Sequence, residues 1–406
     1  MKKQFGNLFL LSTRGIKQFL LSSLIASLSI AMAGGLFLST WKIKEGAQKS
    51  FKLSSSGFDG VLGARGSKLQ LILNAIFHLE ASPGNLDWEQ YELIKNTSGV
   101  KEAYPLAVGD NYMGYRIVGT TPTLLTEHEW KEGIKYQLNQ GGRVFSESNK
   151  EAVVGSFVSS RLGLKVGDTF HPYHGLTFNE SSKHDDIYVV VGILSSTGTP
   201  ADKVIWVPIK GIQHMDGHAS EYANSISAVL LKIKGIAAGM ELSMKYNRQG
   251  NQATLAWPIA PTLASFFKRL VWFEEILKAI AYLIALMSSL IILATLRNSM
   301  NERKREFAIL RCLGAGRSFV TQVVLGQSLI IALAGALGSF LIYFLTSSLA
   351  SYFIRMETGV MLEPFTFDLN SWYVFLSIIF LGLVSGIPPA ISAYRVDISE
   401  NLQHSA

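Results

Sequence analysis

Histidine and aspartate side chains with the spacing of metal ligands gather between residues 171 and 218. Five of the eight histidines lie there. The motifs His171-x-x-His174 and His214-x-x-x-His218 have plausible ligand spacings, and the second pair shares one face if that segment is helical. Imidazole combined with carboxylate suits zinc. The candidate zinc ligands are therefore His171, His174, His184, Asp185, His214 and His218.

An alternative is a set of surface-loop histidines that share no site, because nothing in the sequence shows that the two pairs meet in space. Familiar catalytic patterns do not occur. The chain has no G-x-S-x-G, His128-Glu-Trp-Lys-Glu132 lacks the second histidine of H-E-x-x-H, and V-L-G-A-R-G-S-K at 61–68 lacks the order of a phosphate loop. We therefore expect a non-catalytic chain with no cofactor of its own beyond the candidate zinc.

The composition indicates a membrane protein. The 406 residues are 48% hydrophobic and 17% charged, with a mean hydropathy of +0.26, which is too apolar for an ordinary soluble protein. Four apolar runs are long enough to cross a bilayer: Phe19–Leu38, Ile276–Leu296, Phe319–Leu349 and Tyr373–Ile387. Ala31-Met32-Ala33 resembles a signal-peptide cleavage site, but the apolar run continues past it, which favours an uncleaved anchor.

The spans are expected to be helices of a bundle. We expect Pro261–Leu296 to form one long helix, with a stalk that includes Leu270, and Pro388-Pro389 to stop the fourth span. The pairs Ala334/Gly338 and Gly382/Gly386 have spacing that permits close helix contact, or that only eases ordinary packing. The runs contain essentially no ionisable residue of the kind that forms an ion relay.

The distribution of the net charge of +7 predicts how the chain is oriented in the membrane. Segments 1–18, 297–317 and 390–406 hold eleven basic and four acidic residues, which leaves 26 of each sign elsewhere. The excess is therefore explained by positive-inside topology, with both termini cytoplasmic, and no basic patch is left for nucleic acid. The single cysteine, Cys312, lies in a cytoplasmic segment, so the exported part cannot depend on disulfides.

The exported part, 41–268, is polar and mixed in structure. Strands are predicted at Lys101–Asp110, Tyr115–Thr120, Ile187–Ile193 and Lys203–Pro208, where β-branched residues and alternation are frequent. A helix is predicted at Leu86–Ser98, and residues of about 143–215 are predicted to form a second lobe.

The loop Asn298–Arg317 lies between two spans and is predicted to form a short basic helix. Ser299 and Glu302 have capping-box spacing, and Gly314–Gly316 supplies the stop. Basic loops also occur merely because they stay inside the cell, so charge alone identifies no role.

The letters of this loop, E-R-K-R-E-F-A-I-L-R-C-L-G-A, resemble the corresponding loop of the FtsX/MacB/LolC (type VII) ABC transporter permeases. The phrases A-V-V-G-S, L-G-L-K-V-G-D and G-I-L-S-S-T-G-T-P-A-D resemble the periplasmic core domain of the MacB class. The tail resembles the family's P-A-x-x-A-x-R-x-x-P ending, with Asp397-Ile398 where a proline usually stands. The resemblance implies a coupling helix that docks on a separate ATPase through Glu302, Arg303, Arg305, Glu306, Leu310, Gly314 and Ala315.

The fold implied is an α+β membrane protein with four transmembrane helices and a large two-lobed α/β periplasmic domain inserted between the first and second spans. The expected division is 1–40, amphipathic segment and first span; 41–268, periplasmic core domain; 269–297, stalk end and second span; 298–317, coupling helix; 318–350, third span; 351–371, short periplasmic loop; 372–390, fourth span; 391–406, cytoplasmic tail.

The function implied is that of a permease subunit in the bacterial inner membrane, which couples ATP hydrolysis in a cytoplasmic ATPase to movement of its periplasmic domain. ATP and magnesium belong to that partner. Other expected partners are membrane lipid, a second permease copy or paralogue, and a periplasmic protein. Two alternatives stay open: a zinc-linked or other divalent-metal transport system, and an FtsX-like regulator that moves no cargo.

Overall fold

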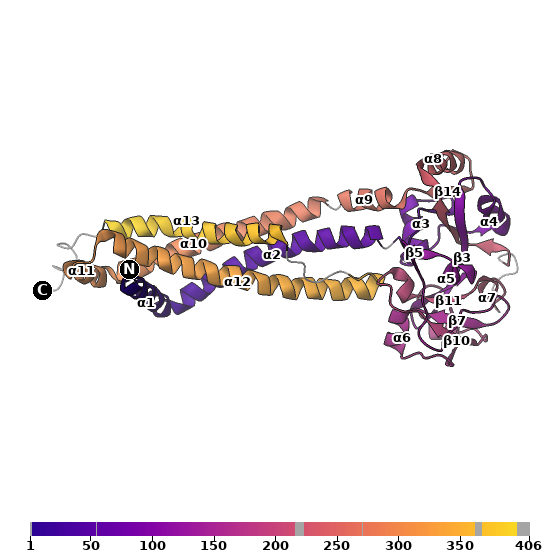
Figure 1. Cartoon of the computed structure of the whole chain (residues 1–406), viewed down its shortest axis with the longest axis horizontal. Coiled ribbons are helices and arrows are strands. Elements are labelled where there is room, and N and C mark those ends of the chain that lie inside the picture. The colour runs from indigo at the N-terminus through magenta and orange to yellow at the C-terminus, as the bar shows by residue number, and fades with distance from the viewer. Residues whose placement is uncertain (1, 54, 216–222, 270, 362–367, 396–406) are drawn as a thin grey trace. The chain divides into compact units, whose positions relative to one another are not determined.

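The computed structural model describes residues 2–53, 55–215, 223–269, 271–361 and 368–395 (Figure 1). They fall into two compact units. The helical unit is drawn from Met1–Glu45, Val271–Ala350 and Glu363–Ala406, and the sheet unit from Gly46–Leu270 and Ser351–Leu362. Two long helices, α2 (Leu20–Leu53) and α12 (Arg317–Thr358), contribute residues to both units.

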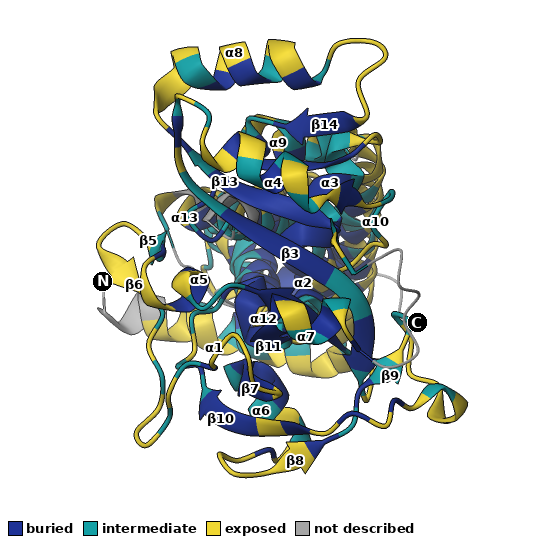
Figure 2. Ribbon diagram, turned by 90° about the vertical axis from the view of Figure 1, so that its right-hand side faces the viewer, coloured by how far each residue is buried: buried dark blue, intermediate teal, exposed yellow. Residues whose placement is uncertain are grey.

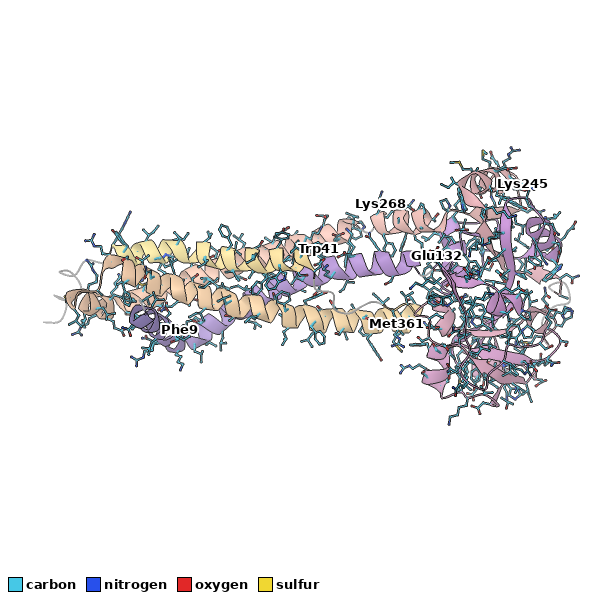
Figure 3. All side chains as sticks on the ribbon, viewed as in Figure 1. Phe9, Trp41, Glu132, Lys245, Lys268 and Met361 are labelled. Atoms are coloured by element: carbon cyan, nitrogen blue, oxygen red, sulfur yellow. The ribbon has the colours of Figure 1, made fainter. Side chains whose placement is uncertain are left out.

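The helical unit contains the apolar helices that the sequence predicts. It is built from α1 (Lys2–Gln18), the first part of α2, α10 (Val271–Glu302), α11 (Lys304–Cys312), most of α12, and α13 (Leu369–Tyr394). Among the described residues, four segments are long and apolar enough to cross a membrane: Leu20–Gln48, Val271–Glu302, Arg317–Thr358 and Ser371–Tyr394. Phe9 projects from α1 with 65% of its surface exposed, as expected of a helix with an apolar face (Figure 3).

The prediction that Pro388-Pro389 stops the fourth span is wrong, because α13 continues through both prolines to Tyr394. Neither proline can donate an amide hydrogen bond, so the helix loses two backbone bonds there. The turn beyond them is held by packing, since Ala390 and Ala393 are buried in one cluster with Phe307 of α11. Tertiary burial has overridden the local signal for a helix end.

The predicted single helix over Pro261–Leu296 appears as α9 (Ile259–Arg269) and α10. Leu270, which the prediction placed in the stalk, lies outside the described residues.

The sheet unit is built on a ten-stranded mixed sheet. Its order is β14-β1-β13-β3-β4-β11-β7-β10-β8, and β9 also pairs with β3. The strands are β1 (Gly60–Ala64), β3 (Val100–Tyr112), β4 (Tyr115–Thr120), β7 (Glu151–Val154), β8 (Thr169–Phe170), β9 (Tyr173–His174), β10 (Tyr188–Ile193), β11 (Ile205–Pro208), β13 (Ala228–Ile233) and β14 (Ala253–Ala256). Two small ribbons pair β2 (Leu86–Asp87) with β12 (Ser225–Ile226), and β5 (Glu129–Lys131) with β6 (Ile134–Lys135).

The long strand β3 joins the two halves of the sheet. Its first part pairs with β13 and its second part with β4, and both pairings are antiparallel. Only β10–β7 and β11–β4 are parallel among the pairings of the described strands. The sheet is therefore continuous into the region of about 143–215, and the lobe boundaries stay a prediction.

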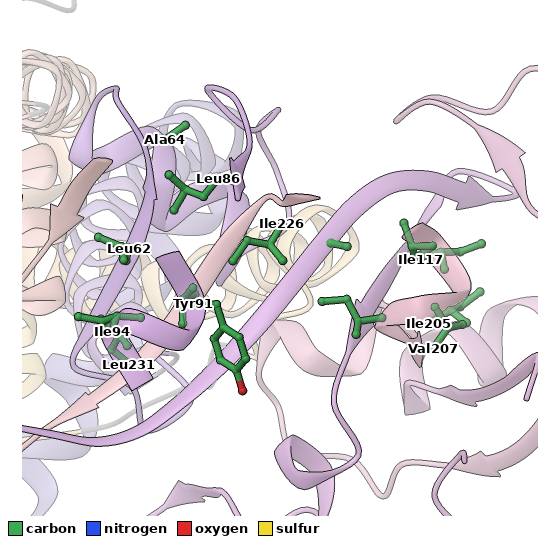
Figure 4. Close-up of a cluster of buried hydrophobic side chains, with 14 of the residues drawn as sticks. Leu62, Ala64, Leu86, Tyr91, Ile94, Ile117, Ile205, Val207, Ile226 and Leu231 are labelled. Atoms are coloured by element: carbon green, nitrogen blue, oxygen red, sulfur yellow. The ribbon is translucent and has the colours of Figure 1, made fainter. Parts of the chain in front are cut away.

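Both faces of the sheet are buried (Figure 2). Along β11, Ile205 and Val207 belong to one apolar cluster, and Trp206 belongs to the other, as the two-residue period of a strand requires. Figure 4 shows the first cluster, which α4 (Trp88–Lys95), α6 (Ser156–Leu162), α7 (Ile209–Gln213) and α8 (Gly235–Tyr246) cover. The second is covered by α3 (Lys68–Ala75), α5 (Thr123–Thr126) and α9.

Most local predictions for this unit agree with the structure. The four predicted strands appear as β3, β4, β10 and β11, and the helix predicted at Leu86–Ser98 appears as α4, preceded by the short strand β2. The 3₁₀ helix η2 spans Pro200–Lys203 between β10 and β11, and a second such helix, η1, spans Glu180–Ser182.

Candidate functional site

The short helix predicted in the loop Asn298–Arg317 is present, but it begins later than its capping box indicates. Ser299 is buried inside α10, and Glu302 is the last residue of that helix, where its carboxylate accepts a hydrogen bond from Asn298 Nδ2 at 3.2 Å. The capping-box prediction is therefore wrong. The reason is packing, since Met300 is buried in the core of the helical unit and keeps α10 helical past Ser299.

The predicted glycine stop of α11 is confirmed. Gly314 has a φ of +97°, a left-handed conformation that glycine adopts without strain. Its amide donates to the carbonyl of Arg311, and the amide of Ala315 donates to that of Leu310. These two bonds form a Schellman motif, which satisfies the last carbonyls of the helix and turns the chain sharply into α12.

The inner face of α11 packs into the helical unit. Phe307 and Ala308 are 1% and 0% exposed, and they lie in one cluster with residues of α10, α12 and α13. Arg303 is buried with them, although it is charged. Its Nε donates to Glu306 Oε2 at 2.8 Å, and its guanidinium carbon lies 5.0 Å from the centre of the Phe307 ring. Arg303 therefore holds the base of α11 in place.

The outer face of α11 is exposed and mixes charge with apolar surface. Leu313 is 80% exposed and Ile309 is 45% exposed, and they stand four residues apart beside exposed Arg305 and Glu306. Of the residues predicted to face an ATPase, Glu302, Arg305, Glu306 and Gly314 are exposed, Leu310 and Ala315 are half-buried, and Arg303 is buried.

The sequence analysis did not single out Ile309 and Leu313. The signal that would have found them is the presence of two apolar residues four positions apart in a basic loop, a spacing that places them on one helical face.

The candidate zinc ligands are only partly brought together. Asp110, His174 and His184 place one ligand atom each within 4.8 Å of one another. His184 Nε2 lies 3.2 Å and His174 Nδ1 lies 3.4 Å from the same oxygen, Asp110 Oδ1. Two predicted histidines are therefore neighbours, and their carboxylate partner is one that the sequence did not suggest.

The other predicted ligands take different positions. His171 contacts the backbone carbonyl of His184 through Nδ1 at 3.2 Å, and Asp185 is exposed. His214 lies at the end of α7, where its Nδ1 contacts the carbonyl of Lys210 at 3.1 Å. His218 lies outside the described residues.

Strand pairing brings the three cluster residues together. In the antiparallel pair β3–β9, Asp110 stands directly opposite His174, and Asn111 opposite Tyr173. A register shift between Val108 and Asp110 marks a bulge in β3, a device that re-aims side chains. The signal available in the sequence was an acidic residue, Asp110, that ends the predicted strand after the uncharged stretch 103–109.

Comparison with known proteins identifies the C-terminal part of the chain. Residues 278–398 match the family described as FtsX-like permease C-terminal, and this segment contains α11. This part of the chain is similar to the C-terminal part of FtsX-like permeases. The family resemblance carried by E-R-K-R-E-F-A-I-L-R-C-L-G-A is thereby confirmed.

The chain matches no curated protein sequence. Among solved structures it is similar to the periplasmic region of MacB from Actinobacillus actinomycetemcomitans, with 12% identity and a TM-score of 0.33 over 54% of this chain and 95% of that one. A likeness at this level carries no argument about the sheet unit.

Proposed function

We propose that this FtsX-like permease docks on a separate cytoplasmic ATPase through the exposed face of α11 and transmits the motion of that ATPase to the sheet unit. The observation that carries the proposal is the position of Leu313 and Ile309 beside Arg305 and Glu306. Exposed apolar side chains bordered by charge are typical of a docking surface. The chain itself performs no catalysis in this scheme, and ATP and magnesium are bound by the partner.

In this scheme the four apolar helices cross the inner membrane, both termini are cytoplasmic, and the sheet unit is a two-lobed periplasmic domain between the first and second spans. Support comes from the positive charge of segments 1–18, 297–317 and 390–406. Two permease copies, or one copy with a paralogue, match the twofold geometry of an ATPase dimer.

The helix α12 is the proposed transmitting element. It starts at Arg317, directly after the Schellman turn of α11, and its last residues belong to the sheet unit. There Lys203 Nζ donates to the carbonyl of Glu357, and the amide of Met361 donates to the carbonyl of Gly198 at 3.3 Å. Val360 is fully buried in the second apolar cluster of the sheet.

The loop that receives the end of α12 is itself firmly held. Asp202 is 2% exposed, and its carboxylate accepts hydrogen bonds from the amides of Thr197 and Gly198 at 2.8–3.0 Å. A displacement of α12 along its axis would therefore act on a loop that hydrogen bonds hold in one conformation. This arrangement supports a lever in which no charged path through the spans is needed.

The test of docking is co-purification of a co-expressed ABC ATPase with full-length permease in detergent, together with the ATPase rate. Leu313→Asp combined with Ile309→Asp places two charges on the exposed face and none in the core. We expect this variant to retain at most a tenth of the ATPase that the native chain retains. The matched control is Ile236→Asp on α8, which changes a side chain that is 72% exposed in the sheet unit.

Retention of the ATPase by the double variant would overturn the proposal, as would failure of the native chain to retain any ATPase. Circular dichroism of the variants shows whether the helices are intact, so a loss of binding can be separated from unfolding.

A further inference from the structure

Asp110, His174 and His184 place three ligand atoms of the kinds that bind transition metals within 4.8 Å of one another. We infer that these side chains form a binding site for a divalent metal ion of the zinc class. The inference concerns the sheet unit alone and does not depend on the docking role of α11.

Two of the three distances in the cluster match those between ligands of one ion. A tetrahedral zinc ion with bonds of about 2.0–2.2 Å holds its ligand atoms roughly 3.3 Å apart. His184 Nε2 and His174 Nδ1 lie 3.2 and 3.4 Å from Asp110 Oδ1. All three ligand atoms lie within 4.8 Å of one another, so an ion placed between them would be within reach of each.

A second histidine–carboxylate contact in the sheet unit differs from the cluster in the number of imidazoles, although the contact between His184 Nε2 and Asp110 Oδ1 is also within hydrogen-bonding distance at 3.2 Å. His128 Nδ1 lies 2.8 Å from Glu102 Oε2, which is the usual length of a charge-assisted N–H···O bond. In the cluster both imidazoles approach one carboxylate oxygen, and both stay farther from it. A shared ion would account for the convergence of two imidazoles on one carboxylate oxygen.

Burial gives the site a closed side and an open side. The side chains of Asp110 and His184 are 0% and 6% exposed, whereas that of His174 is 60% exposed. A divalent cation at this place would lie against the buried carboxylate of Asp110 and offset its negative charge. The exposed His174 provides the entry from solvent, and three protein ligands leave a fourth position of a tetrahedral ion open.

Surrounding polar contacts hold the ligands in place. Asn111 Nδ2 donates to the carbonyls of Tyr173, Gly175 and Thr177 at 2.9–3.3 Å, which fixes the segment that carries His174. The amide of His184 donates to the carbonyl of Pro172 at 2.9 Å, so the two ligand-bearing segments are tied to each other. A supporting layer of this kind orients metal ligands before the ion arrives.

The donor set selects the class of metal. Calcium and magnesium prefer sites made only of oxygen ligands, whereas two imidazoles with one carboxylate suit zinc and similar ions. We therefore expect zinc and cobalt(II) to bind and calcium and magnesium not to compete.

The experiment uses full-length permease in detergent, purified on an affinity tag without histidine and washed with chelator. Zinc is titrated by calorimetry, and the bound metal per chain is measured by atomic emission. Cobalt(II) serves as a spectroscopic probe, because a tetrahedral nitrogen and oxygen site gives strong visible absorption. We expect His174→Ala to weaken zinc binding at least tenfold and to remove the cobalt spectrum.

The matched control is His214→Ala, because His214 is also exposed on the sheet unit but lies outside the cluster. We expect this variant to bind zinc as the native chain does. Asp110→Asn, which keeps the size of a buried side chain, should weaken binding by a similar factor to His174→Ala. The inference is overturned if the native chain binds no zinc, if His174→Ala binds it unchanged, or if His214→Ala weakens it equally. None of these results affects the co-purification test of α11, so the two proposals fail separately.

Discussion

The guanidinium carbon of Arg303 lies 5.0 Å from the centre of the Phe307 ring, with the arginine side chain only 3% exposed. A cation over an aromatic face in a desolvated place contributes about 2 kcal/mol to stability. The charged residue at the base of α11 is thus part of the packing that fixes the helix. Its neighbour Arg305 is exposed and belongs to the outer face.

Replacement of Arg303 by alanine should therefore destabilise the helical unit. The change removes the contact with Phe307 and leaves a cavity, and we expect a loss of about 2–4 kcal/mol. Arg303→Lys should recover only part of it, because lysine lacks the planar group that lies over the ring. Thermal unfolding in detergent measures the effect, with Arg305→Ala as the exposed control. Equal melting temperatures for Arg303→Ala and Arg305→Ala would refute this role.

Gly382 and Gly386 of α13 contact α12 closely. Ser328 Oγ donates to the carbonyl of Gly382 at 2.5 Å, and a Cβ at Gly386 would lie 2.6 Å from Ser328 Cβ. A Cβ at Gly382 would overlap the Cβ of Ala332. Small residues thus allow the backbones of α12 and α13 to approach, which is the main source of helix association in lipid.

Gly382→Val should force these helices apart and lower the yield and melting temperature of the purified protein, with a cost of about 1–3 kcal/mol. The control is Ala334→Val. Ala334 has the same small-residue spacing with Gly338 in the sequence, but it is exposed in the structure. Size-exclusion chromatography and thermal unfolding compare the two variants. Equal stability of the two would show that the close contact at Gly382 is not required.

The sequence predicts elements well where burial repeats with a regular period. The strands β3, β4, β10 and β11 and the four apolar helices were all foreseen for this reason. It failed where packing competes with a local signal, as at Ser299 in α10 and at Pro388 in α13. Burial of Met300 and Ala390 decided both cases, and burial between helices has no local signature in the chain.

The candidate metal site shows a second limit of prediction from the sequence, which is the pairing of distant strands. His174 and His184 were foreseen because they are rare residues close together in the chain. Asp110 lies 64 residues before His174, and only the pairing of β3 with β9 places them opposite each other. Register between distant strands depends on the whole sheet, so this partner could not be read from spacing.

Glu151, at the start of β7, is expected to make the sheet unit less stable at acidic pH. Its carboxylate receives two hydrogen bonds from Arg143 at 2.6 and 2.7 Å, one from the amide of Ser146 and one from Asn149. The Arg143 guanidinium, with these further donors, lowers the pKa of Glu151 from 4.5 to about 2. Because the folded-state pKa is below the unfolded one, the stabilisation is complete above about pH 4.5 and is lost as the pH falls towards 2.

Glu151→Gln should therefore be less stable than the native chain at pH 7, by about 2 kcal/mol, since it loses hydrogen bonds to a charged acceptor. The difference should shrink as the pH is lowered from 4.5 towards 2, because the native carboxyl becomes protonated in that window. Thermal unfolding at a series of pH values measures both effects. The control is Glu132→Gln, which changes an exposed carboxyl on the turn between β5 and β6. A difference between Glu151→Gln and the native chain that stays constant down to pH 2 would contradict the assignment of this acid sensitivity to Glu151.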